Sequence, residues 1–96
     1  MSVGVINELT QFYDKAVNDE RIGYTHICLY MALFQFWNLN GFKNPVYISR
    51  SNLMKAAKIS GRATYHKAIK QLEEYGYIIY IPSWNPDIKS RVYLIT

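Results

Sequence analysis

The sequence has only one cysteine, Cys28, in 96 residues. A single thiol excludes a disulfide within the chain, and a reducing compartment fits this composition. The longest apolar run, from Ile27 to Phe34, falls far short of the roughly 18 residues that a membrane span needs. No N-terminal stretch combines a basic flank, an apolar run and a small-residue cleavage site. We therefore expect no export signal, no membrane partner and a cytoplasmic location.

The sequence also lacks the residue patterns of an enzyme. Its two histidines, His26 and His66, are far apart, and no Cys/His cluster has metal-binding spacing. There is no phosphate-cradling glycine motif and no nucleophile elbow. Asp19 and Glu20 fall in an expected surface loop, and Cys28 lies in the most apolar segment, where packing is its expected role. We expect no enzymatic activity, no catalytic residue, no metal site and no cofactor.

What the chain does have is apolar and aromatic side chains. Half of its residues are hydrophobic, and nine Tyr, four Phe and two Trp make 16% of it aromatic. This composition excludes disorder and supplies a dense core, which so short a chain needs. No repeat, low-complexity segment or linker divides the chain, so we expect a single domain over residues 1–96.

The net charge of +4 is unevenly distributed along the chain. Residues 1–45 hold three basic and four acidic side chains, whereas residues 46–96 hold eight basic and three acidic ones. Such an excess in one half is typical of a surface that binds a polyanion, although ordinary surface charge would also account for it.

Helical spacing of apolar residues predicts four helices, over residues 5–18, about 26–39, 50–58 and 62–75. The second is apolar nearly all round, which predicts a central helix buried on every side, with Thr25 as its N-cap and Gly41 as its stop. The first has an apolar stripe that exceeds what one packing contact needs. That stripe consists of Ile6, Leu9, Phe12, Tyr13, Ala16 and Val17.

The third and fourth predicted helices form a pair joined by a short turn. Ser49 is a good N-cap for the third helix, Gly61 breaks the pair, and Gly76 stops the fourth helix. The inner face of the fourth helix has clean helical spacing. It consists of Tyr65, Ala68, Ile69 and Leu72.

Three segments read as strands. Residues 77–81 and 91–95 are rich in β-formers and flank a loop with turn-forming residues, which predicts a hairpin. The triplet 46–48 is β-prone and is expected to pair with that hairpin in a three-stranded sheet.

The stretch RATYHKAIKQLEEYGYI, from Arg62 to Ile78, resembles the recognition helix and first wing strand of bacterial winged-helix regulators. The GntR family has the closest rhythm, and the likeness covers about residues 46–96. The leading helices are similar to those of small winged-helix proteins of mobile elements and of phage and plasmid replication proteins. Two departures are that Gly61 stands where the GntR family usually has serine, and that residues 1–96 include no segment expected to form the effector-binding domain of that family.

This resemblance implies an α+β, mainly helical, winged helix-turn-helix fold with an extra N-terminal helix at 5–18. The helix-turn-helix would span residues 49–75, and the wing hairpin residues 77–95. The fourth helix would then enter the major groove of double-stranded DNA. The residues expected to contact DNA are Arg50, Arg62, Thr64, His66, Lys67, Lys70, Gln71, Lys89 and Arg91.

Trp84, in the hairpin loop, is expected to fold back over the sheet, with a DNA contact as the alternative. The leading functional hypothesis is a small transcriptional regulator that works as a homodimer through the N-terminal helix. A DNA-binding accessory factor of a mobile element, in replication, excision or partition, needs the same surface. The third hypothesis is a winged-helix module that binds proteins, which would need an exposed aromatic patch around Trp84.

Overall fold

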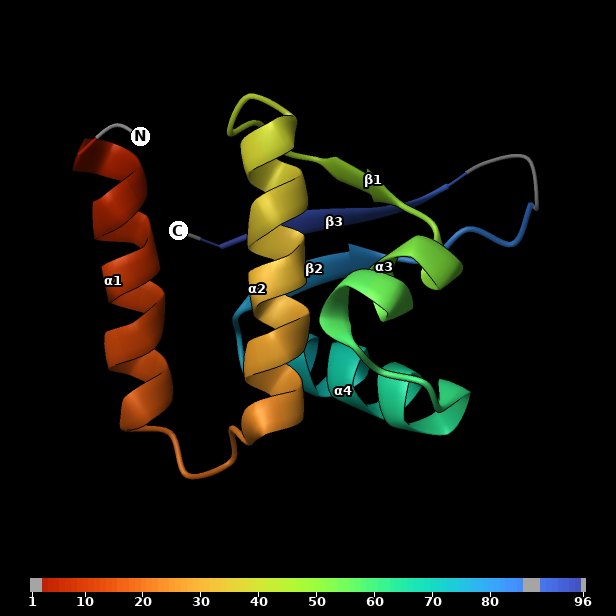
Figure 1. Cartoon of the computed structure of the whole chain (residues 1–96), viewed down its shortest axis with the longest axis horizontal. Coiled ribbons are helices and arrows are strands. Elements are labelled where there is room, and N and C mark those ends of the chain that lie inside the picture. Colours follow the sequence, from red (N-terminus) through yellow and green to blue (C-terminus); the bar gives the residue numbers. More distant parts are fainter. Residues whose placement is uncertain (1–2, 86–88, 96) are drawn as a thin grey trace.

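The computed structural model of the chain describes the backbone of residues 3–85 and 89–95, and the side chains of residues 7–85 and 89–95 (Figure 1). Within these ranges lie four helices and a three-stranded antiparallel sheet, which confirms a mainly helical α+β class. Their order is α1 (Val3–Val17), α2 (Tyr24–Leu39), β1 (Val46–Ile48), α3 (Arg50–Ala57), α4 (Arg62–Glu74), β2 (Ile78–Ile81) and β3 (Ser90–Leu94).

The sheet has β3 in its centre, between β1 and β2. Val92 of β3 is opposite both Val46 and Tyr80, and all three strands are antiparallel to their neighbours. Because side chains alternate across a strand, one face of the sheet carries Val46, Ile78, Val92 and other buried residues. Helix α2 crosses this inner face (Figure 1). The opposite face, in contrast, carries exposed side chains such as Tyr47 and Ile79. The predicted pairing of residues 46–48 with the hairpin is confirmed.

The apolar stripe predicted for α4 is confirmed, since Tyr65, Ala68, Ile69 and Leu72 are all buried. Gly76 follows this helix with a φ of 85°, the left-handed conformation expected of its stop. The buried stripe fixes the rotation of α4 about its axis, and therefore which of its side chains face solvent.

The ends of α3 differ from the prediction at one point. Ser49 caps its N-terminus, because the Ser49 hydroxyl accepts a 3.3 Å hydrogen bond from Asn52 N. At the other end the left-handed residue is Lys58, with a φ of 61°, and not Gly61. Gly61 instead precedes α4 in an extended conformation as its N-cap. The helix pair therefore turns at a lysine, which takes a conformation that glycine adopts more easily.

Helix α2 corrects two predictions. Its N-cap is Gly23, whose backbone N–H donates a 2.9 Å hydrogen bond to His26 Nδ1, so Thr25 lies inside the first turn. The helix is also not buried on every side. Leu29 and Leu33 are fully buried, but one face is open to solvent. That face includes Tyr24, Ile27, Cys28, Met31 and Gln35, so the expected packing role of Cys28 is wrong.

Helix α1 lies beside α2, on the side away from α3 and α4 (Figure 1). Phe12 attaches it: its ring stacks on that of Tyr30, with centroids 3.7 Å apart and planes 5° from parallel. Phe12 and Ala16 are buried, whereas Tyr13 and Val17 of the predicted stripe are 61% and 63% exposed. Ile6 lies outside the described side chains. Part of the stripe therefore faces solvent. None of the helices in the described ranges is long and apolar enough to cross a membrane.

Candidate nucleic-acid interface

The solvent-facing side of α4 is cationic over its first turns. With the apolar stripe turned inward, Arg62, His66, Lys67 and Lys70 are all exposed. In the part of the chain that the structure describes, none of these side chains forms an ion pair with a carboxylate. Their charge is therefore available to an external anion. The acidic residues of this helix, Glu73 and Glu74, lie at its other end.

The beginning of α4 offers backbone donors as well. The N-cap residue, Gly61, has no side chain that could accept a hydrogen bond. The first N–H groups of the helix therefore have no side-chain acceptor at that position. Thr64 is exposed next to Gly61, and the positive end of the helix dipole lies there. A phosphate group is the ligand that such a helix end favours.

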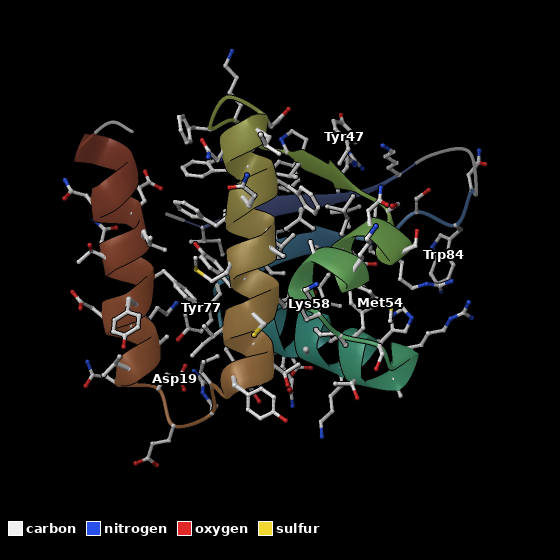
Figure 2. The ribbon with its side chains drawn as sticks, in the orientation of Figure 1. Asp19, Tyr47, Met54, Lys58, Tyr77 and Trp84 are labelled. Carbon is white, nitrogen blue, oxygen red and sulfur yellow. The ribbon has the colours of Figure 1, made fainter. Side chains whose placement is uncertain are left out.

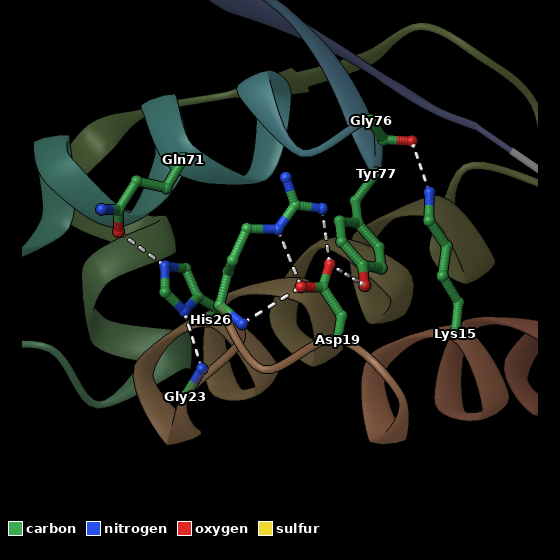
Figure 3. Close-up of polar contacts among 8 residues, drawn as sticks. Lys15, Asp19, Gly23, His26, Gln71, Gly76 and Tyr77 are labelled. Atoms are coloured by element: carbon green, nitrogen blue, oxygen red, sulfur yellow. Dashed lines mark hydrogen bonds and ion pairs between the residues drawn. The ribbon is translucent and has the colours of Figure 1, made fainter.

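Gln71 has a different environment from the one predicted. It is half-buried, and its Oε1 accepts a 2.7 Å hydrogen bond from His26 Nε2 (Figure 3). Because His26 Nδ1 accepts from Gly23 N, His26 is the neutral tautomer that carries its proton on Nε2. Gln71 thus ties α4 to the start of α2, and its side-chain oxygen is engaged within the protein.

A cavity of about 470 Å³ opens between α4, the start of α3 and the β2–β3 hairpin. Three of the predicted DNA-contacting residues, Arg50, His66 and Lys70, line it together. Tyr65 and Tyr80 also contribute to its wall. Burial raises the pKa of the Tyr65 hydroxyl, which lies in the wall as a neutral group.

The hairpin places its two predicted contacts differently. Lys89 is exposed just before β3. Arg91 is opposite Tyr47 and Ile81 in the sheet, and its parity with the buried Val92 puts it on the outer face, away from α4. The structure therefore brings Arg50, His66 and Lys70 together and separates Arg91 from them. Residues 86–88 of the hairpin loop lie outside the described residues.

Trp84 does not fold back over the sheet. Its side chain is 92% exposed and projects from the hairpin on the same side of the molecule as α3 and the first turn of α4 (Figure 2). It also lines the cavity. The sequence predicts a loop at Trp84 but does not indicate the cavity, because three elements that converge on one space leave no local pattern in the sequence.

Within residues 3–85 and 89–95, no three His, Cys, Asp or Glu side chains gather to hold a metal ion. Compared with family models, with curated proteins and with solved structures, the chain matches none of them.

Proposed function

We propose that the chain is a winged helix-turn-helix protein that binds double-stranded DNA, with α4 in the major groove, and acts as a small transcriptional regulator. In this assignment α3 and α4 are the helix-turn-helix, β2 and β3 are the wing, and α1 is an addition to the fold. The order of the elements and the three-stranded sheet support the assignment, together with the likeness of residues 62–78 to winged-helix regulators.

The observation that carries the proposal is the exposed cationic face of α4. An amphipathic helix with an ordinary solvent face mixes both signs of charge. In α4 the solvent-facing side chains of the first two turns are basic or neutral. The carboxylates come only after them. Arg62 has the fork geometry that reads a guanine or binds a phosphate, and Lys67 supplies charge to the DNA backbone.

Two further contacts frame this face. Arg50, at the start of α3, lines the same cavity as Lys70, and we expect it to bind a phosphate beside the groove. We expect the exposed Lys89 to do the same from the hairpin. Arg91, on the outer face of the sheet, contributes by long-range attraction. Gln71 has a positioning role, because its hydrogen bond to His26 holds α4 against α2.

A homodimer through α1 is the second part of the proposal. A groove of about 440 Å³ runs between α1 and α2, and its lining is almost entirely apolar. Tyr13, Ile27 and Met31 line it and are exposed. Val17 of α1 and Tyr24 of α2 are further exposed hydrophobic side chains on the same two helices. An exposed apolar surface of this kind is typical of an interface, and two copies would read two half-sites.

The direct test is binding of labelled duplex fragments, measured by electrophoretic shift and fluorescence anisotropy at several salt concentrations. The proposal expects the logarithm of the binding constant to fall linearly with the logarithm of the salt concentration, and some fragments to bind far more tightly than others. No binding even at low salt would reject it.

Two alternative functions remain, and one of them has a structural observation in its favour. An accessory role in a mobile element needs the same DNA-binding face, and a recombinase or relaxase gene beside this one would favour it. A protein-binding module is favoured by Trp84, whose exposure supplies the aromatic surface which that hypothesis requires. It expects Trp84 to be essential for function and the basic face of α4 to be dispensable.

A further inference from the structure

The cavity between α4 and the hairpin has the character of a binding site for a small molecule. Its volume, about 470 Å³, lies in the range in which proteins enclose a single ligand. Its inner wall is largely apolar, since Ile48, Tyr65 and Ile69 line it and are all buried. A ligand with a flat apolar face would fit this wall better than a hydrated ion would.

The open edge of the cavity carries an aromatic ring with no partner. Trp84 is 92% exposed, and among the described residues no other ring stacks on it. Its indole therefore offers a free π-face directly beside the apolar wall. Stacking of a second planar ring would bury this face and use the preferred geometry of aromatic pairs.

The charge of the lining selects the rest of the ligand. Arg50 and Lys70 are cationic, and His66 adds a further polar group. The one carboxylate in the lining, Glu73, already accepts a 2.8 Å hydrogen bond from Tyr80 N through its Oε2. The cavity thus combines a flat aromatic surface with an excess of positive charge, which is complementary to a ring that bears a phosphate.

We propose that this cavity binds one unpaired nucleotide, with its base stacked on Trp84 and its phosphate held by Arg50 and Lys70. In a paired duplex both faces of a base are covered by neighbours, so only an unstacked base can enter. This inference rests on the proposed DNA binding and deepens it. The protein would prefer DNA that contains an unpaired base next to the duplex read by α4.

Tryptophan fluorescence tests the proposal on the full chain. The two tryptophans differ in environment, since Trp37 is buried and Trp84 is exposed. The probes are deoxyadenosine monophosphate, a short oligodeoxyadenylate, a fully paired duplex, and the same duplex with one bulged adenosine. We expect the single strand and the bulged duplex to quench Trp84 emission, and this quenching to be absent in Trp84→Phe, in which only the buried Trp37 emits.

Affinities measured in parallel give the quantitative outcome. Trp84→Ala should weaken binding of the bulged duplex about tenfold and that of the paired duplex less than twofold, because stacking is lost only where a base is free. Tyr47→Ala is the matched control, since Tyr47 is 59% exposed on the outer face of the sheet (Figure 2), and it should change neither affinity.

The outcomes separate this inference from the proposed function. If the paired and bulged duplexes bind equally well and no nucleotide quenches Trp84, the inference is wrong and the duplex-binding proposal stands. If deoxyadenosine monophosphate alone quenches Trp84 and neither duplex binds, the cavity takes a free nucleotide and the duplex-binding proposal fails. If no probe binds or quenches, both fail, and Trp84 is left as a surface for a protein partner.

Discussion

The hydroxyl of Tyr77 donates a 3.0 Å hydrogen bond to Asp19 Oδ2, although 58 residues separate the two in sequence (Figure 3). Asp19 lies in the loop between α1 and α2, and Tyr77 directly precedes β2. Burial and this hydrogen bond raise the pKa of Tyr77 to about 12, so the hydroxyl keeps the proton that it donates. Nearby, Lys15 Nζ donates to Gly76 O at 3.0 Å and lies 4.2 Å from the centre of the Tyr77 ring. The α1–α2 loop is thus fastened to the end of α4 and the start of the hairpin.

Acid stability should depend on Asp19. Its carboxylate accepts side-chain hydrogen bonds of 2.8 and 2.9 Å from Arg21, and these are the main reason why the pKa of Asp19 is held well below its ordinary range. A folded-state pKa below the unfolded value stabilises the protein above the unfolded pKa, about 3.9, and this contribution is lost as the pH falls from there through the lower pKa of the folded state. Asp19→Asn should lower stability at neutral pH and flatten the loss of stability on acidification.

Denaturant unfolding at a series of pH values measures this effect. Glu20→Gln is the matched control, because Glu20 is the next residue in the same loop, is exposed, and makes no side-chain hydrogen bond within the described part of the chain. It should leave the pH profile close to that of the original protein. An Asp19→Asn profile parallel to the original one below pH 4 would show that the Asp19 contacts do not contribute.

Two glycine substitutions at and before the turn between α3 and α4 should change the free energy of unfolding in opposite directions. Lys58 has a φ of 61°, a conformation that an L-residue other than glycine adopts at a cost of about 1–2 kcal/mol. Lys58→Gly should therefore raise the free energy of unfolding by about 1 kcal/mol. Lys55→Gly, one turn earlier inside α3, should lower it by about 1 kcal/mol, because glycine in a helix interior is unfavourable.

Equilibrium unfolding in urea measures both variants under one condition. Since both remove one exposed lysine and introduce glycine, the loss of charge and side chain is matched. If Lys58→Gly were as destabilising as Lys55→Gly, the left-handed conformation of Lys58 would be wrong.

The apolar groove between α1 and α2 predicts self-association. In the absence of DNA, light scattering at micromolar concentrations should give twice the mass of a single chain. Tyr13→Glu should shift the mass to that of the monomer, because it places a charge in an otherwise apolar interface. Tyr47→Glu changes a tyrosine of nearly equal exposure on the sheet and should leave the dimer intact. A single-chain mass for the original protein would contradict the dimer.

The sequence predicts α4 well and α2 poorly, and the reason is physical. The stripe from Tyr65 to Leu72 has one apolar face, and an amphipathic helix has only one way to bury it. Helix α2 is apolar on all sides, so periodicity cannot indicate which side remains open. Ile27 and Met31 are exposed there because α1 lies against Tyr30 instead.

Some residues of the candidate interface can likewise be placed from the sequence, and others cannot. Exposure of Arg62 and Lys67 follows from the rotation of α4, which the stripe fixes. The hydrogen bond between Gln71 and His26 joins positions 45 residues apart, so no local sequence pattern predicts it. The outward face of Arg91 follows from its register with Tyr47, which becomes known only when the strands are paired.

The salt dependence of DNA binding by an α4 variant tests the central claim most directly. Arg62→Ala/Lys67→Ala should weaken binding to duplex DNA and reduce the slope of the logarithm of affinity against the logarithm of salt by about 0.9 for each phosphate contact removed. Lys43→Ala removes an exposed lysine from the α2–β1 loop and should leave affinity and slope unchanged. If the double variant binds duplex DNA with the affinity and slope of the original protein, α4 is not the DNA-binding helix.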